Sequence, residues 1–351
     1  MQALRWHGQN DVRLDEVPDP EITNGDDVII EVEFCGICGT DIHEFTDGPQ
    51  MIREAAHPLT SLRPPITLGH EFSGFVSQIG SDISDIHIGQ LVTVDPCLYC
   101  GQCPSCLRGD YHICTSGGSV GLASDGALAT YVKVQRKNVI PVPDGIPADW
   151  AAVAEPLAVG YHAARRARIK AGDQVLITGA GPIGIASLLS ALALGASAVF
   201  VSEPSSERSK LAKSLGATAV FSPQESDVRR QVYELTGKVG PDASIEATGR
   251  ADAFELAFTS LRRGGRISVA GISDSKLTVS LHQLVLYERE ILGSLGYNLD
   301  IQRVLELMAE GLLDPSPFVT AKFSLSQSPR LFAESALGKS THLKTLLTPK
   351  E

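Results

Sequence analysis

The chain has 351 residues, of which 43% are hydrophobic and 20% are charged, and its formal net charge is −11 at pH 7. Chains longer than about 250–300 residues usually divide their core between domains, so we expect two domains. The strong negative charge argues against nucleic acid or an anionic membrane surface as a partner.

The first part of the chain, to about residue 155, is predicted to be rich in β-strands. Short β-branched runs such as Asp27–Val32 and Gln90–Val94 are separated by frequent turn residues. This pattern indicates a compact β domain whose loops carry most of the cysteine and histidine residues.

A dense group of cysteines lies within this β domain. The spacing Cys100-x2-Cys103-x2-Cys106-x7-Cys114 allows four thiolates from one loop to close a tetrahedral zinc site. Cys97 lies close by, and spacing alone does not exclude it as a ligand. The chain has seven cysteines and no basic-then-apolar export signal at its start. Both features favour reduced, metal-binding cysteines in the cytoplasm over disulfides.

A sparser group of potential metal ligands surrounds Cys38 and His70. Cys38 supplies a thiolate and His70 an imidazole, whereas Glu71 and Glu155 compete for the third position. A set of three protein ligands leaves one coordination position open, as a catalytic zinc requires. The two groups together predict two zinc ions per chain with different roles.

The second part of the chain alternates strands and helices. This alternation predicts a parallel, doubly wound sheet. The uncharged stretch 174–202 reads as strand, turn, helix and strand, because several glycines interrupt it, so we do not expect a membrane span. The predicted strands are Gln174–Thr178, Ala198–Ser202, Thr218–Phe221, Ala243–Glu246, Arg266–Ala270 and Ile291–Gly293, and the predicted helices include Ile183–Leu194, Ser205–Leu215, Ala251–Leu261 and Ile301–Glu310.

A glycine-rich motif follows the first of these strands and opens a helix. In this context, Gly-x-Gly-x-x-Gly predicts a dinucleotide-binding turn, with the pyrophosphate at the helix N-terminus. Glu203 ends the next strand, where a carboxylate is expected to bind the ribose hydroxyls and to favour NAD. Arg208 keeps NADP open as an alternative. The predicted contacts of the motif are Gly179, Gly181, Pro182, Ile183 and Gly184.

These motifs resemble those of the zinc-containing medium-chain alcohol and polyol dehydrogenases over essentially the whole chain. Within that family, several shorter runs are most similar to the branch that acts on 2,3-butanediol. The family resemblance is carried by Gly36–His43, Gly69–Glu71, Cys100–Cys114, Glu155–Leu157, Gly179–Gly184 and Lys344–Pro349, and the branch resemblance by Ala3–Gly8, His43–Pro49, His57–Thr60, Leu68–Gly74 and Val201–Pro204.

The resemblance implies an α/β protein made of a GroES-like β-rich catalytic domain (1–154, completed by 296–351) and a Rossmann domain (155–295). It implies that Cys38, His70 and either Glu71 or Glu155 bind the catalytic zinc, and that Asp41 orients His70. Cys97 is left spare. It also assigns Cys100, Cys103, Cys106 and Cys114 to the structural zinc, Thr40 and His43 to a proton relay, and Lys344 to a cofactor phosphate.

The expected reaction is hydride transfer between a secondary alcohol or vicinal diol and NAD. A sorbitol-like polyol dehydrogenase or an L-threonine dehydrogenase would carry the same metal sites and stays an alternative. A zinc- or redox-sensing protein that binds a cofactor without turnover is a second alternative. We expect a homodimer or homotetramer whose only other partner is the small-molecule alcohol.

Overall fold

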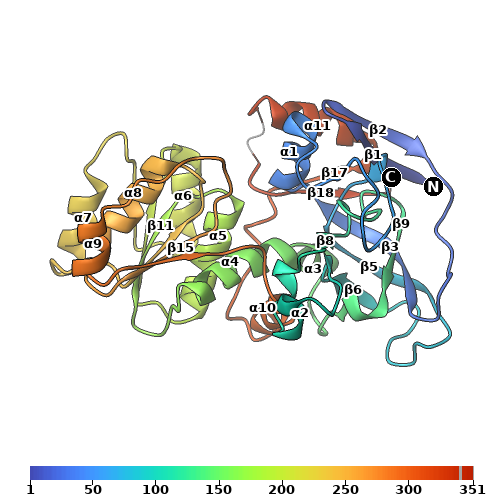
Figure 1. The fold of residues 1–351 in the computed structure, drawn as a ribbon, viewed down its shortest axis with the longest axis horizontal. Coiled ribbons are helices and arrows are strands. Elements are labelled where there is room, and N and C mark those ends of the chain that lie inside the picture. The colour runs from blue at the N-terminus through green and yellow to red at the C-terminus, as the bar shows by residue number, and fades with distance from the viewer. Residues whose placement is uncertain (340–341, 351) are drawn as a thin grey trace. The chain divides into compact units, whose positions relative to one another are not determined.

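The computed structural model describes residues 1–339 and 342–350, which form two compact units (Figure 1). The first unit comprises Met1–Glu155 and Phe318–Glu351, and the second comprises Pro156–Pro317. The chain therefore returns to the first unit at Phe318, later than the expected residue 296. The reason is that helix α10 (Asp300–Ala309) is bound within the second unit through its first residue.

The first unit is built mainly from antiparallel strands. A large sheet has the order β10-β6-β5-β3-β18-β17, with β9 also paired to β3, and a smaller sheet has the order β2-β1-β4. The strands are β1 (Gln2–Gly8), β2 (Asp11–Glu16), β3 (Asp27–Gly36), β4 (Ile66–Thr67), β5 (Glu71–Ile79), β6 (Leu91–Val94), β7 (Cys97–Leu98), β8 (Gly118–Ser119), β9 (Tyr131–Gln135), β10 (Val139–Pro141), β17 (Ala321–Ser324) and β18 (Thr345–Thr348).

Strand β3 lies at the centre of this unit. Its apolar residues on both faces, including Val28, Ile29 and Ile30, are fully or almost fully buried, because neighbouring elements cover the strand on each side. β18 pairs antiparallel with β3 and parallel with β17, so the predicted terminal strand Thr345–Thr348 is confirmed. The short helices of the unit are α1 (Gly39–Asp47), α2 (Pro104–Leu107), α3 (Ala148–Ala152) and α11 (Ser328–Ala336).

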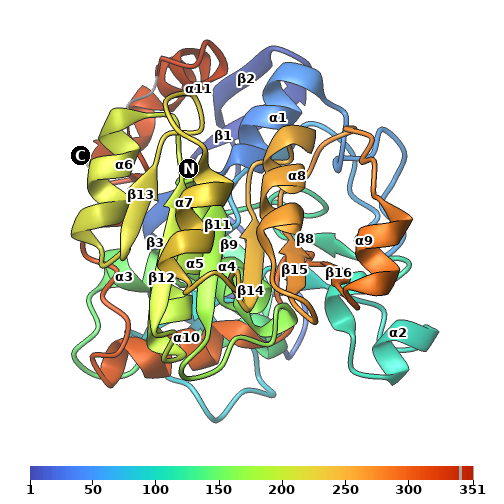
Figure 2. The same ribbon diagram turned by 90° about the vertical axis from the view of Figure 1, so that its left-hand side faces the viewer.

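The second unit contains the predicted parallel sheet. Its strand order, β13-β12-β11-β14-β15-β16, is that of a Rossmann fold, and every pairing is parallel (Figure 2). The expected α/β fold class is thereby confirmed. The strands are β11 (Gln174–Thr178), β12 (Ala198–Ser202), β13 (Ala219–Phe221), β14 (Ala243–Glu246), β15 (Arg266–Val269) and β16 (Glu290–Gly293).

Helices connect these strands by crossovers that run in both directions from β11. Because such crossovers are right-handed, the helices on the two sides of β11 cover opposite faces of the sheet. Helix α5 packs on β11 and β12, and α8 packs on β14 and β15. No helix in the described part of the chain is long and apolar enough to cross a bilayer. The helices are α4 (Ala154–Arg166), α5 (Pro182–Ala193), α6 (Ser206–Ser214), α7 (Val228–Leu235), α8 (Ala251–Ser260), α9 (Leu281–Leu286) and α10.

Helix α10 shows why the second unit extends to residue 317. Ile301, Val304, Leu305 and Met308 recur at helical spacing and are buried. Asp300 accepts a hydrogen bond from the imidazole Nδ1 of His162 on α4 at 2.8 Å, and the same carboxylate pairs with Arg165 on that helix. Apolar burial and a buried carboxylate thus bind α10 to α4.

Candidate metal and cofactor sites

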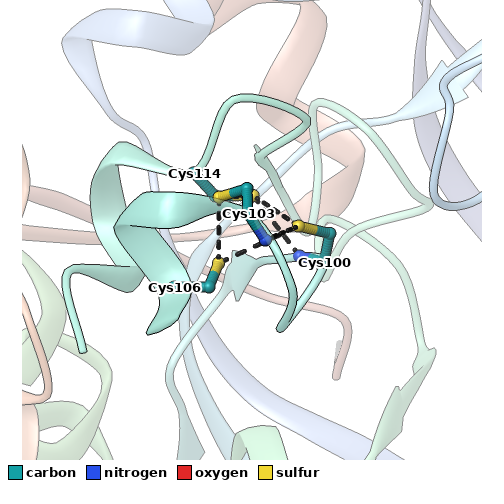
Figure 3. Close-up of side chains that lie close together, drawn as sticks. All are labelled: Cys100, Cys103, Cys106 and Cys114. Atoms are coloured by element: carbon teal, nitrogen blue, oxygen red, sulfur yellow. Dashed lines mark hydrogen bonds between the residues drawn. The ribbon is translucent and has the colours of Figure 1, made fainter. Parts of the chain in front are cut away.

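The four cysteines of the dense group converge on one point (Figure 3). Their Sγ atoms are 3.5 Å apart for Cys103–Cys106 and for Cys100–Cys114, 3.9 Å for Cys103–Cys114 and 4.0 Å for Cys100–Cys106. A tetrahedral zinc with Zn–S bonds of about 2.3 Å holds its sulfur atoms about 3.8 Å apart. The observed separations therefore fit a zinc ion bound by four thiolates.

Backbone amides around this group favour the thiolate form that zinc binds. The N–H groups of Cys100 and Cys103 donate to the sulfur atoms of Cys114 and Cys100, each at 3.3 Å. Hydrogen bonds from backbone N–H groups, first that of Cys106 and then that of Thr115, lower the pKa of Cys103. A lowered thiol pKa makes the deprotonated ligand accessible near neutral pH.

Cys97 differs from these four residues. Its sulfur lies 3.8 Å from the carbonyl oxygen of Tyr111, to which the thiol donates. It is not among the four cysteines whose sulfur atoms gather. The geometry therefore supports a site made by Cys100, Cys103, Cys106 and Cys114.

The sparse group is brought together from two segments of the first unit. The ligand atoms of Cys38, His70 and Glu71 lie within 4.8 Å of one another, and His70 and Glu71 are buried. Cys38 is the residue before helix α1, whereas His70 and Glu71 stand at the start of β5. Thiolate, imidazole and carboxylate in one cluster are the donor types that catalytic zinc sites use.

Asp41 orients two of these residues, Cys38 and His70. One oxygen of its buried carboxylate accepts a hydrogen bond from the backbone N–H of Cys38 at 3.0 Å. The other lies 3.5 Å from Nδ1 of His70, and neither of these two buried atoms has another hydrogen bond to a residue that the structure describes. Burial alone lowers the pKa of His70, but the charges of Asp41 and Cys38 outweigh it and raise that pKa well above its usual value. This carboxylate thus holds the ring so that Nε2 is left for a metal.

Glu71 has a cationic partner that the sequence did not reveal. The ammonium of Lys344 donates to both carboxylate oxygens, at 2.6 and 2.8 Å, and to the carbonyl of Ile37 at 3.2 Å. Both side chains of the ion pair are almost fully buried. Burial lowers the pKa of Lys344, yet the facing charge of Glu71 more than compensates and raises it. The two residues are 273 positions apart, so no local pattern could have paired them.

The remaining predicted residues of this site lie on α1 and α4. The thiol of Cys38 lies 3.6 Å from the hydroxyl of Thr40, close enough for both to face one bound group. The side chain of His43 is 73% exposed and lies 3.9 Å from Asp47. Glu155 is buried in the first turn of α4, and its charge contributes to the raised pKa of Lys344. The contact predicted between Lys344 and a cofactor phosphate stays a prediction.

The glycine-rich motif lies between β11 and α5 of the second unit. Gly179 has a φ of 93°, which favours glycine, and a Cβ on Gly184 would collide with the carbonyl oxygen of Gly179. By contrast, a Cβ on Gly181 would meet nothing within 4 Å. Pro182 and Ile183 form the first turn of α5, whose free N–H groups favour an anion. This open, amide-lined turn fits the pyrophosphate of a dinucleotide.

Glu203 is fixed beside that turn. Its carboxylate accepts hydrogen bonds from the backbone N–H groups of Ala180 at 2.7 Å and of Ser205 at 2.8 Å. Each oxygen keeps a second lone pair, so the carboxylate can still accept from ribose hydroxyls. Arg208 is exposed on α6, and its main chain donates to the hydroxyl of Ser205.

Comparison with known proteins agrees with this arrangement. Residues 24–144 match the alcohol dehydrogenase GroES-like domain, and residues 182–310 match the zinc-binding dehydrogenase domain. The chain is 35% identical to an (R,R)-butanediol dehydrogenase from Neisseria gonorrhoeae, over 93% of each chain. It is 30% identical to a sorbitol dehydrogenase from Bacillus subtilis, over 99% of this chain and 97% of that one.

A solved structure gives the same result for the fold. The crystal structure of 2R,3R-butanediol dehydrogenase from Bacillus subtilis superposes with a TM-score of 0.93 at 33% identity, over 99% of each chain. The match spans both units, so it covers the two ligand clusters and the glycine-rich turn together. The chain therefore belongs to the zinc-binding dehydrogenase family and is a zinc-dependent oxidoreductase of alcohols.

Proposed function

We propose that this protein interconverts (R,R)-2,3-butanediol and acetoin with NAD as the hydride acceptor. The observation that supports it is the pairing of a Cys38–His70 ligand cluster with a Rossmann turn on a chain similar to two butanediol dehydrogenases. A polyol such as sorbitol is the second candidate, because a sorbitol dehydrogenase is similar over almost the whole chain. L-Threonine stays a third candidate.

The residues of the first unit divide the chemistry among them. Zinc, when bound, supplies a Lewis acid that lowers the pKa of an alcohol. Cys38 and His70 hold it, and Asp41 keeps the imidazole in the required orientation. The hydroxyl of Thr40 accepts the alcohol proton and passes it toward His43, whose exposed imidazole delivers it to solvent.

The third protein ligand is assigned to Glu155. Both oxygens of Glu71 are held by Lys344, so a second cation on that carboxylate would face the ammonium. Glu155 is buried at the start of α4 and acts electrostatically on the same lysine. Glu155→Ala is therefore expected to reduce the zinc content from two ions per chain to one, and Glu71→Ala to retain both. Elemental analysis showing the reverse pattern assigns the position to Glu71.

A panel of alcohols tests the substrate. We expect kcat/KM for (R,R)-2,3-butanediol to exceed that for sorbitol and for L-threonine by at least about tenfold, which corresponds to about 1.4 kcal/mol of transition-state preference. Initial rates of NADH formation at 340 nm measure the ratio. A tenfold preference for sorbitol or threonine would assign the chain to the corresponding alternative.

The choice of NAD is assigned to Glu203. The 2′-phosphate of NADP would lie against this buried carboxylate, whose position two amide N–H groups fix. Glu203→Ser is expected to weaken use of NAD and improve use of NADP together. Arg208→Gln is the matched test of the neighbouring cation and should lower only the residual NADP activity. An unchanged NAD/NADP ratio in Glu203→Ser would show that another residue selects the cofactor.

The second unit also offers a surface for self-association. Strand β16 is the last strand of the sheet order in the described part of the chain, and large apolar side chains are exposed in the surrounding segment. They are Ile272, Leu281, Val285, Leu286, Leu295 and Leu299. Exposed apolar groups beside a sheet edge are typical of a protein interface, and a two-fold pair of such edges gives a closed dimer. Leu281→Lys/Val285→Lys should yield monomers by sedimentation, whereas Leu337→Lys on the first unit should not.

A further inference from the structure

A pocket of about 460 Å³ in the second unit is lined by basic side chains. Arg229 comes from α7, Lys238 from the loop that follows it, Arg262 and Arg263 from the turn after α8, and Arg289 from the segment before β16. No carboxylate is among its lining residues. Such a concentration of positive charge is unexpected on a chain whose net charge is −11.

The pocket lies away from the dinucleotide turn of the same unit. Its residues precede β14, β15 and β16, so they gather at the amino-terminal edge of the parallel sheet. The glycine-rich turn follows β11 at the carboxyl-terminal edge. Strands of four or five residues separate the two edges by roughly 15 Å. The pocket is therefore not part of the cofactor site.

Arg289 is the buried arginine among the lining residues of this pocket. Its guanidinium donates to the carbonyl oxygens of Leu261 and Thr259 and to the side chain of Gln283, all of them uncharged groups. It also lies over the rings of Phe258 and Tyr287. Burial, followed by the charge of Arg229, lowers its pKa. These contacts, with a further hydrogen bond from Nε to the carbonyl oxygen of Arg262, cap the end of α8 and explain why Arg289 is buried. Among the residues that the structure describes, no carboxylate pairs with its positive charge.

The other basic residues are only partly neutralised. Arg262 pairs with Asp242 at 2.7 Å, and Lys238 lies 3.9 Å from Glu234. Arg229 and Arg263 have no ion pair with a carboxylate in the described part of the chain, and the guanidinium of Arg263 lies over the ring of Tyr287. Three arginines of the pocket thus lack a carboxylate partner among the described residues, and the positive charge of Arg229 acts unfavourably on that of Arg289.

We infer that this pocket binds a small phosphorylated anion that carries at least two negative charges. Planar guanidinium groups match phosphate oxygens in paired hydrogen bonds, and several arginines around one cavity are the usual arrangement for such ligands. Tyr233 and Thr259 also line the pocket, and each carries a hydroxyl that can donate a hydrogen bond.

Inorganic pyrophosphate is the probe that tests this site. The zinc-loaded protein is first saturated with NAD, which fills the dinucleotide turn, and pyrophosphate is then titrated at constant ionic strength by calorimetry. Saturable binding is expected. Arg229→Gln and Arg263→Gln should each weaken it by at least about tenfold, because each removes a charge-assisted hydrogen bond. Both variants should keep wild-type turnover, since neither residue belongs to the catalytic machinery.

Arg230→Gln is the matched control. Arg230 neighbours Arg229 on α7 and loses the same charge, but it does not line this pocket. The affinity of the Arg230→Gln protein for pyrophosphate should stay within about twofold of that of the wild type. Absence of saturable binding to the NAD-saturated protein would overturn the inference, and so would equal weakening in Arg229→Gln and Arg230→Gln, which indicates unspecific charge attraction. Neither result bears on the diol substrate.

Discussion

The two ligand clusters of the first unit are built in opposite ways. The dense cluster takes four identical side chains from one loop, Cys100–Cys114, and their sulfur atoms already have the separations of a closed tetrahedron. The sparse cluster takes three different side chains from two separate segments, and two of these side chains have a charged, buried residue as a further partner. One cluster is self-contained, whereas the other depends on Asp41 and Lys344.

The two constructions indicate different roles for the two clusters. A closed set of thiolates has no position left for a substrate, so its zinc contributes to folding. A mixed, incomplete set leaves a position open, but its members must be held by outer partners that fix their orientation and charge. Removing a ligand from the sparse cluster should therefore lower turnover, whereas removing one from the dense cluster should lower stability.

The largest expected effect on turnover belongs to Cys38→Ser. Loss of the catalytic zinc should lower kcat/KM by at least about a thousandfold, equivalent to about 4 kcal/mol of transition-state stabilisation. Serine is a favourable residue before a helix, so α1 keeps its cap and the fold should persist. Zinc analysis should give one ion per chain, and circular dichroism should match the wild type. A folded Cys38→Ser protein that retains two zinc ions and full turnover would place catalysis elsewhere.

Cys103→Ser is expected to act mainly on stability. Without its zinc, the loop between β7 and β8 loses the contacts that order it, at a cost of about 4 kcal/mol or more in the free energy of unfolding. That cost corresponds to a fall in Tm of roughly 8–16 °C for a unit of this size. Ser105→Ala on the same short helix α2 is the control and should change Tm little. Equal Tm values for Cys103→Ser and the wild type would show that the loop needs no metal.

The ion pair of Glu71 and Lys344 offers an intermediate effect. Removing one member leaves the other charged and buried, so Glu71→Gln and Lys344→Met should each reduce the free energy of unfolding by about 3–5 kcal/mol. The double variant leaves no buried charge at this position and should be more stable than the sum of the two losses predicts. Urea unfolding of the zinc-loaded proteins measures the coupling. Strictly additive losses would mean that the two residues act independently of each other.

More of the dense cluster than of the sparse cluster could be predicted from the sequence. The gathering of the four sulfur atoms in the dense cluster could be predicted, because these cysteines lie in one short segment at a spacing that lets one loop bring them together. In the sparse cluster, residue type suggested Cys38 and His70, but the partner of Glu71 could not be predicted. Lys344 reaches it only because β18 pairs with β3, which brings the end of the chain beside its beginning.

The fold shows the same limit. The strands of the second unit were predicted to within about a residue, because each is a short apolar run followed by turn residues. Helices α7, α9 and α11 were not predicted. These helices have 8, 6 and 9 residues, so the periodic pattern that identifies a helix is short in each. The late return to the first unit at Phe318 was missed for a similar reason, since Asp300 meets His162 only in the folded protein.

The smallest expected effect belongs to Cys97→Ser, which tests whether the dense cluster is closed. The sulfur of Cys97 is not among the four that gather at one point, so this thiol is not placed to bind the same zinc ion. A serine hydroxyl can still donate to the carbonyl of Tyr111, as the thiol does. We therefore expect two zinc ions per chain and a loss below about 1 kcal/mol in the free energy of unfolding. Cys106→Ser, the comparison variant, should lose one zinc ion. Loss of a zinc ion from Cys97→Ser would instead show that Cys97 is a ligand and that the four other cysteines do not form a closed site by themselves.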